Sequence, residues 1–136
     1  MHHPLTIALL VGCGGFFGSL SRYGLSLLSQ RTPYDWPIGT MAANVLGCFL
    51  VGLIAGLTER GEVISPAMRL ALATGFCGGF TTMSSYMYEI AEMLRASEYV
   101  HAGYYAAGTL ALSFAAFIAG VVAVRVLIKM GGGVWN

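Results

Sequence analysis

Charged side chains are scarce in this chain. Only 10% of its 136 residues are Asp, Glu, Lys or Arg, whereas a soluble domain carries about 25%. Hydrophobic residues make up 57% of the sequence, and the mean hydropathy is +0.73. These values exclude an ordinary soluble domain and predict an integral membrane protein. The formal net charge of +1 gives no indication of a nucleic-acid partner.

Cysteine is also rare, and its spacing carries no metal or redox motif. Cys13, Cys48 and Cys77 lie in apolar stretches, and no two of them form a CxxC pair. Cysteines in such surroundings are typical of small buried side chains rather than of a disulfide or a metal site. The sequence pairs no nucleophile with a base, and no glycine-rich loop follows a strand pattern. We therefore expect no enzyme activity.

What the chain does contain is long apolar stretches. We predict an all-α protein in one domain, with four transmembrane helices at about residues 5–28, 38–57, 67–95 and 99–128, because about 20 apolar residues are enough to cross a bilayer. Glycine is abundant, with 19 residues, and small residues allow the backbones of membrane helices to approach closely.

Positive charge is divided almost evenly between the two ends of this arrangement, so the positive-inside signal is weak. Either orientation should then insert at comparable cost. Four helices of this size enclose little polar volume alone, and we infer a homodimer, for which an antiparallel arrangement is open. The residues counted are Arg60, Arg69, Arg125 and Lys129 at one end, and Arg31 and Arg95, with Arg22 close by, at the other.

The third apolar stretch is interrupted by residues that disfavour a continuous helix. Between Thr74 and Tyr86 it holds a Gly pair, a Thr pair and a Ser pair. Glycine weakens a helix interior, and hydroxyls offer the backbone competing hydrogen bonds. Non-helical backbone survives in a membrane only where protein buries it or a wet cavity adjoins it. We predict a break at residues 78–82, with its carbonyls facing an ion, and these breaks meeting near the dimer axis.

Neutral hydrogen-bond donors recur in the other helices. Asn44 is the strongly polar side chain of the second helix, and it either ties two helices together or donates to a permeating anion. Tyr105, Thr109 and Ser113 recur every four residues and so share one face of the fourth helix. Their hydroxyls either bond their own i−4 carbonyls or form a polar track.

Two charged residues have open roles at this stage. Arg22 either extends to the membrane interface or forms a cationic collar or a tie between subunits. Glu89 is expected at the water interface, with a pore mouth as the alternative.

An anion path accounts for this set of residues best. Moving a bare anion into hydrocarbon costs tens of kcal/mol by order-of-magnitude Born estimates, so hydrogen-bond donors must replace its water. A proton-coupled exporter built as a four-helix dimer is the main rival, but it needs a carboxylate deep in an early helix, and the first two helices have none. A structural subunit would explain the glycines but not the aligned polar groups. The neutral donors are Asn44, Ser84, Tyr105, Thr109 and Ser113.

Three motifs give the chain a resemblance to the Fluc (CrcB) fluoride channel family. The resemblance extends over all four helices. The motifs are Gly14-Gly15-Phe16-Phe17-Gly18-Ser19-Leu20-Ser21-Arg22-Tyr23, Gly39-Thr40 with Ala43-Asn44-Val45-Leu46-Gly47-Cys48-Phe49, and Gly75-Phe76-Cys77-Gly78-Gly79-Phe80-Thr81-Thr82.

The resemblance implies a fluoride channel in the microbial cell (inner) membrane, formed by a dual-topology homodimer with two antiparallel pores. It implies a structural sodium ion held by the backbone carbonyls of Gly78 and Thr81 from both subunits. Its pore asparagine falls on Asn44, and its acidic position after the helix-three motif falls on Glu89. Its helix-four polar track falls on Tyr105, Thr109 and Ser113.

The chain departs from the family pattern at the paired phenylalanines that follow the Gly pair. Met83 and Tyr86 stand at these positions, with Ser84 between them. Tyr86 keeps a ring whose positive edge can face an anion. Met83 offers only a flexible thioether with weakly positive methyl and methylene groups. We expect both side chains to line the fluoride pore.

Overall fold

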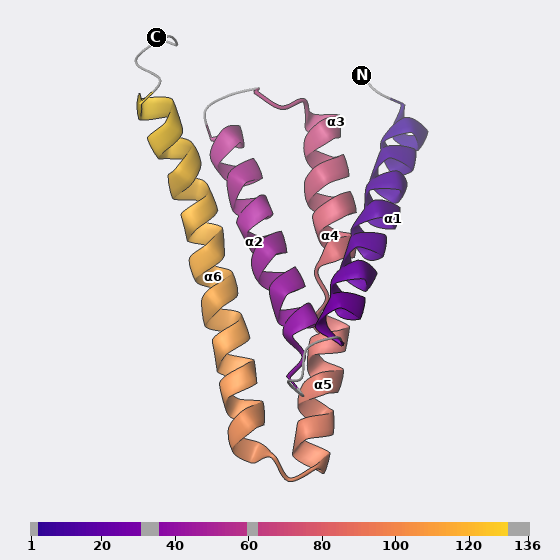
Figure 1. Ribbon diagram of the computed structural model, residues 1–136. Coiled ribbons are helices and arrows are strands. Elements are labelled where there is room, and N and C mark those ends of the chain that lie inside the picture. Colours follow the sequence, from indigo (N-terminus) through magenta and orange to yellow (C-terminus); the bar gives the residue numbers. More distant parts are fainter. Residues whose placement is uncertain (1–2, 31–35, 60–62, 131–136) are drawn as a thin grey trace.

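The computed structural model describes residues 3–30, 36–59 and 63–130, and these residues form helices and short connections without a strand. Neighbouring long helices run side by side, and both ends of the chain lie at the same end of the molecule (Figure 1). Arg31 and Arg60, which entered the charge count, lie outside the described residues. The elements are α1 (Pro4–Ser29), α2 (Ile38–Thr58), α3 (Pro66–Arg69), η1 (Leu70–Cys77), α4 (Gly78–Phe80), α5 (Met83–Arg95) and α6 (Tyr99–Met130).

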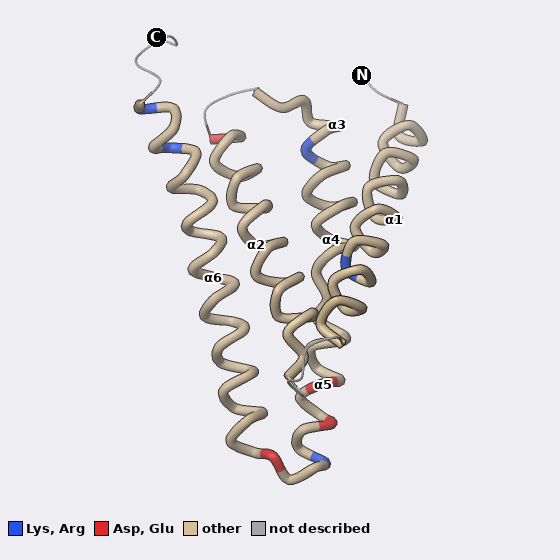
Figure 2. Tube along the Cα trace, in the orientation of Figure 1, with Lys and Arg blue, Asp and Glu red and all other residues tan. Residues whose placement is uncertain are grey.

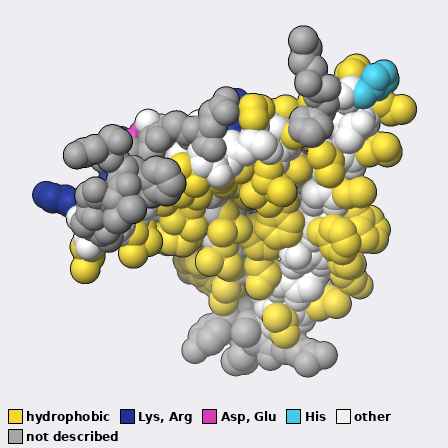
Figure 3. Space-filling view, turned by 90° about the horizontal axis from the view of Figure 1, so that it is seen from above, with side chains coloured by type: hydrophobic (Ala, Val, Ile, Leu, Met, Phe, Trp, Pro, Cys, Tyr) yellow, Lys and Arg dark blue, Asp and Glu magenta, His cyan; other side chains and the backbone are white. Residues whose placement is uncertain are grey.

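Three of these helices, α1, α2 and α6, are long and apolar enough to cross a membrane. Large apolar side chains such as Phe16, Tyr104 and Phe114 lie on the outside of the described structure. Seen from the end that carries the termini, much of the visible surface is hydrophobic (Figure 3). An aqueous solvent would make so much exposed apolar surface costly, whereas lipid does not. The chain is therefore a multi-pass membrane protein.

Most charged residues gather toward the two ends of the helices, and the exception lies on α1 beside the divided segment (Figure 2). At one end Arg125 of α6 donates two hydrogen bonds to the carboxylate of Glu59, through Nη2 at 2.7 Å and Nε at 3.1 Å. At the other end Arg95 pairs with Glu92 one turn earlier on α5, at 2.6 Å. Both pairs are exposed, as expected of charges at a membrane surface.

The segment from Pro66 to Arg95 runs beside the long helices but is divided (Figure 1). It begins as an α-helical turn, continues as a π-helix through η1 and returns to a single α-helical turn in α4. Thr81 and Thr82 are then extended, with φ/ψ of −82°/155° and −151°/116°. The expected break at 78–82 is thus too wide, because Gly78–Phe80 remain helical. The π-helix was not predicted.

Glycines bring the backbones of paired helices into direct contact. A Cβ at Gly18 of α1 would fall on the carbonyl oxygen of Phe76, and one at Gly79 would come within 2.5 Å of the Gly15 carbonyl oxygen. On the other side of the fold, Gly52 of α2 packs in the same way against the backbone of α6 at Phe117. These small residues let α1 approach the divided segment and α2 approach α6.

Candidate functional site

Thr82, the second of the two extended residues of the divided segment, is bound by a side chain of α2. Asn44 accepts a hydrogen bond at its Oδ1 from the backbone N–H of Thr82, at 2.8 Å. Its Nδ2 donates to the Thr82 carbonyl oxygen, at 3.2 Å. The amide therefore replaces both backbone partners that Thr82 loses by leaving the helix. Asn44 ties two helices together, and one N–H of its Nδ2 remains for another acceptor.

The other side of the break is bound by α1. The guanidinium of Arg22 donates from Nε to the carbonyl oxygen of Gly79, at 3.2 Å, and the hydroxyl of Ser19 lies 3.4 Å from the same oxygen. Gly79 belongs to the last turn before the chain becomes extended, where carbonyls have no partner within the helix. Arg22 is thus directed to the divided segment, a contact that neither sequence interpretation included.

The remaining carbonyls of the break differ in their partners. The Cys77 carbonyl accepts hydrogen bonds from the N–H and the hydroxyl of Thr81, each at 2.9 Å. Within the described parts of the chain, the carbonyl oxygens of Gly78 and Thr81 accept no hydrogen bond. Free carbonyls at the end of a helix carry partial negative charge, so they suit a cation.

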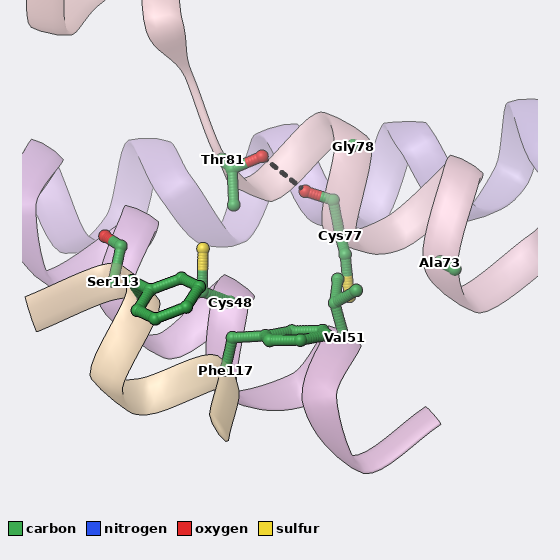
Figure 4. Close-up of a pocket in the computed structure, with 9 residues that line it drawn as sticks. Cys48, Val51, Ala73, Cys77, Gly78, Thr81, Ser113 and Phe117 are labelled. Atoms are coloured by element: carbon green, nitrogen blue, oxygen red, sulfur yellow. Dashed lines mark hydrogen bonds between the residues drawn. The ribbon is translucent and has the colours of Figure 1, made fainter. Parts of the chain in front are cut away.

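A cavity of about 410 Å³ adjoins these residues. Figure 4 shows Thr81 and Cys77 of the divided segment on one side of it, and Cys48 of α2 and Phe117 of α6 on the other, so three separate segments of the chain meet there. Gly47 leaves room for the Thr81 methyl group against α2. The cavity is lined by Cys48, Val51, Ala73, Cys77, Gly78, Thr81, Ser113, Phe114 and Phe117.

The donor set fits a weakly charged, hard cation such as sodium better than a soft or highly charged metal. The oxygens available at the break are neutral backbone carbonyls, which suit alkali cations. No cluster of three or more His, Cys, Asp or Glu side chains occurs in residues 3–30, 36–59 and 63–130. Two carbonyls from one chain, Gly78 and Thr81, would supply only part of a coordination shell.

Glu89 lies among three helices and not simply at a water interface. Its Oε1 accepts a hydrogen bond from the hydroxyl of Thr40 on α2, and its Oε2 accepts one from the hydroxyl of Tyr105 on α6, both at 2.6 Å. Bonds of this length to a carboxylate are charge-assisted and strong. Glu89 is partly buried. The cluster of Thr40, Glu89 and Tyr105 connects α2, α5 and α6.

The three residues of the polar stripe on α6, Tyr105, Thr109 and Ser113, differ in their hydrogen bonding. Tyr105 is only 1% exposed and bonds Glu89. The hydroxyl oxygens of Thr109 and Ser113 are buried and have no hydrogen-bond partner among the described residues. The alternative in which each hydroxyl bonds its own i−4 carbonyl therefore does not hold for these two. They are unpaired polar atoms along a face that begins at Tyr105.

Met83 and Tyr86 stand where the family pattern has its paired phenylalanines, and their side chains have different surroundings. Met83 is 61% exposed, so this chain leaves its side chain uncovered. Tyr86 is 2% exposed, packs its ring against Tyr105 at a centroid distance of 5.4 Å, and donates its hydroxyl to the Ala106 carbonyl at 2.7 Å. Ser84 places its hydroxyl 3.1 Å from that of Thr82, which also accepts from the N–H of Ser85 and so caps α5.

Comparison with known proteins places the chain in a family. Residues 9–121 match the family described as CrcB-like protein, Camphor Resistance (CrcB). The chain belongs to this CrcB family. The matched range includes α2, the whole divided segment and most of α1 and α6, so every residue of the candidate site lies within it.

Curated CrcB-family relatives cover most of the chain. A fluoride-specific ion channel FluC from Chlorobium phaeobacteroides (strain BS1) is 48% identical over 102 residues, which are 75% of this chain and 80% of the relative. FluC from Chlorobium luteolum is 41% identical over 125 residues, covering 92% and 96%. FluC from Phenylobacterium zucineum is 46% identical over 120 residues, covering 86% and 94%.

The sequence analysis gave no individual role to three residues of the site, Ser19, Thr40 and Thr82. Thr40 lies four residues before Asn44 and therefore on the same face of α2, which is a signal that could have found it. Ser19 precedes Arg22 by three residues on α1, so it too shares a face with a noted residue. Thr82 was placed in the break, but its role as the cap of α5 depends on where the break ends.

Proposed function

We propose that this chain forms a passive channel that releases fluoride from the cytoplasm down its electrochemical gradient. Hydrogen fluoride is a weak acid that crosses membranes in neutral form and dissociates in a neutral cytoplasm, which traps the anion. A channel lets the trapped anion leave and reduces its toxicity. The family and the FluC relatives support this function.

The observation that carries the proposal is the pair of unpaired hydroxyls on α6. Leaving a buried hydroxyl without a partner costs about 1–3 kcal/mol. The buried hydroxyl oxygens of Thr109 and Ser113 have no partner at hydrogen-bonding distance among the described residues of the single chain. A dehydrated anion needs such donors, and it supplies the acceptor that the chain lacks. Asn44 adds its remaining N–H, and Met83, Ser84 and Tyr86 complete the proposed pore from α5.

The proposed assembly is an antiparallel, dual-topology homodimer in the inner membrane, with four crossings per chain. The divided segment supplies the crossing that joins α2 to α6. A sodium ion between the two breaks would be held by the carbonyls of Gly78 and Thr81 from each copy. The sodium site is supported by the lack of hydrogen-bond donors to these carbonyls and by the small number of oxygens that one chain provides. The dual topology is supported by the near-even positive charge at the two ends of the helices.

A cation-coupled small-molecule exporter is the second candidate. One observation favours it: Glu89 brings a carboxylate among three helices, as proton coupling requires. The carboxylate is on α5 and is bound by the hydroxyls of Thr40 and Tyr105. Such an exporter would need a proton gradient, whereas the channel would not.

The experiment is fluoride efflux from liposomes, measured with a fluoride electrode. Thr109→Val replaces the hydroxyl by a methyl group of the same shape. We expect efflux to fall about tenfold or more, while the protein is not destabilised, because no internal hydrogen bond is lost and an unpaired buried hydroxyl is removed. Ser113→Ala should act in the same way.

The matched control is Thr58→Val. The Thr58 hydroxyl donates to the Ile54 carbonyl at 2.7 Å and lies at the end of α2. This variant should retain the wild-type efflux rate. Full efflux through Thr109→Val and Ser113→Ala together would remove the α6 stripe from the pore and contradict the proposed path.

A further inference from the structure

The short helix α4 cannot set the direction of its own carbonyls. It is one turn of three residues, between a π-helix and the extended Thr81. Two of the three residues, Gly78 and Gly79, are glycines, which stiffen a backbone least. The carbonyls at the end of a helix also lack partners within it. The orientation of this turn must therefore come from contacts outside it.

Helix α1 supplies such contacts on one side. Because Gly79 has no Cβ, the turn lies directly on the backbone of α1 at Gly15. Ser19 and Arg22 follow Gly15 by four and seven residues, so all three share one face of α1. Both side chains reach the Gly79 carbonyl, at 3.4 and 3.2 Å. A single carbonyl oxygen thus binds a hydroxyl and a guanidinium.

The proposed cation ligands lie on another side of the same turn. Gly78 and Thr81 line the cavity with residues of α2 and α6, among them Ser113 (Figure 4). Successive residues of an α-helix are rotated by about 100°, so fixing one carbonyl of a turn fixes its neighbours. Gly79 lies against α1, whereas Gly78 of the same turn lines the cavity.

We propose that Arg22, assisted by Ser19, is a positioning residue for the cation site. By donating to the Gly79 carbonyl it fixes the α4 turn, so that the carbonyls of Gly78 and Thr81 remain free for the cation. The positive charge of Arg22 alone would repel a nearby cation and so weaken cation binding, whereas its hydrogen bond to Gly79 strengthens cation binding. This inference rests on the sodium site included in the proposed function.

The test is a sodium titration of thermal unfolding, with the full-length protein in detergent and choline chloride keeping the ionic strength constant. Arg22→Ala should raise the sodium concentration that gives half-maximal protection about tenfold, the loss expected for one good hydrogen bond. Arg22→Lys keeps the charge and an N–H donor and should stay within about threefold of wild type. Ser19→Ala should cause a shift of about twofold, because its bond is longer.

Arg69→Ala is the matched control, since Arg69 is exposed at the end of α3. It should leave the half-maximal sodium concentration unchanged. A purely structural role of Arg22 would lower the unfolding temperature equally at every sodium concentration, and this result would overturn the inference. A lower half-maximal sodium concentration in Arg22→Ala would overturn it too, because repulsion would then dominate.

A failure of the proposed sodium site can be distinguished from a failure of the positioning role of Arg22. Sodium retained per chain after gel filtration in choline chloride can be measured by atomic emission. If wild type neither retains sodium nor gains stability from it, both the site and the role of Arg22 are wrong. If wild type is protected but Ser19→Ala matches it, and Arg22→Ala either matches it or does not fold, only the positioning role is wrong.

Discussion

The side-chain amide of Asn44 hydrogen-bonds both the N–H and the carbonyl oxygen of Thr82. It therefore replaces the two backbone partners that Thr82 would have inside a helix. Oδ1 accepts from the Thr82 N–H at 2.8 Å, and Nδ2 donates to the Thr82 carbonyl at 3.2 Å. This relationship fixes which end of the amide faces which group. It leaves a single N–H of Asn44 for a permeating anion.

Asn44→Asp should therefore fail in two ways. A carboxylate oxygen would replace the donor that faces the Thr82 carbonyl, so two acceptors would meet, at a cost of about 1–3 kcal/mol in the free energy of unfolding. The added negative charge would also repel fluoride. We expect destabilisation in detergent and no fluoride efflux from liposomes. Undiminished efflux would show that Asn44 does not contact the path.

The Glu89 cluster yields a prediction about stability. Tyr105→Phe and Thr40→Val each remove one hydroxyl from the same carboxylate, and each should cost about 1–3 kcal/mol. Because both donors serve Glu89, the double variant should deviate from the sum by about 0.5 kcal/mol or more. Thermal unfolding of the four proteins measures this coupling. Tyr104→Phe is the control, since Tyr104 is 69% exposed. Strictly additive losses would mean that the two bonds are independent.

Met83→Phe tests the departure from the family pattern. The Met83 side chain is uncovered in this chain, so a ring can be accommodated without displacing its own core. A ring edge offers positive potential to an anion. We expect normal folding and a fluoride efflux rate equal to or above that of wild type. Met87→Phe, one turn further along α5, should leave the rate unchanged. Complete loss of efflux in Met83→Phe would mean that the pore is shaped around methionine.

Glycine contacts predict a large difference between two similar substitutions on α1. Gly18→Ala would place a methyl group on the Phe76 carbonyl oxygen, while a Cβ at Gly12 meets nothing within 4 Å. Overpacking of this kind typically costs about 1–3 kcal/mol. Thermal unfolding in detergent should show this loss for Gly18→Ala, whereas Gly12→Ala should be neutral or stabilising by up to about 1 kcal/mol, because alanine favours a helix over glycine. Equal stability of the two variants would contradict the close packing of α1 on the divided segment.

The helices could be predicted from the sequence because their signals are local. Apolar length marks α1, α2 and α6, and the paired Gly, Thr and Ser residues mark an interruption near Thr81. The exact extent of that interruption could not be predicted, because it depends on tertiary contacts. Gly78–Phe80 stay helical with α1 packed on them, and only Thr81 and Thr82 are extended.

The candidate site shows the same limit. Polarity and spacing singled out Asn44, Tyr105, Thr109 and Ser113 as a group. Spacing within one helix cannot show which distant backbone group a side chain will meet, so the contact of Arg22 with Gly79 was not predicted. The placement of Glu89 likewise depends on how α2 and α6 pack on α5.

The most direct test of the central claim is fluoride efflux from liposomes that contain the purified protein, with and without an imposed proton gradient. Protein-free liposomes measure the leak of hydrogen fluoride. A channel predicts rapid efflux down the fluoride gradient at the same initial rate in both conditions. Efflux that occurs only with the proton gradient, or that does not exceed the protein-free leak, would contradict it.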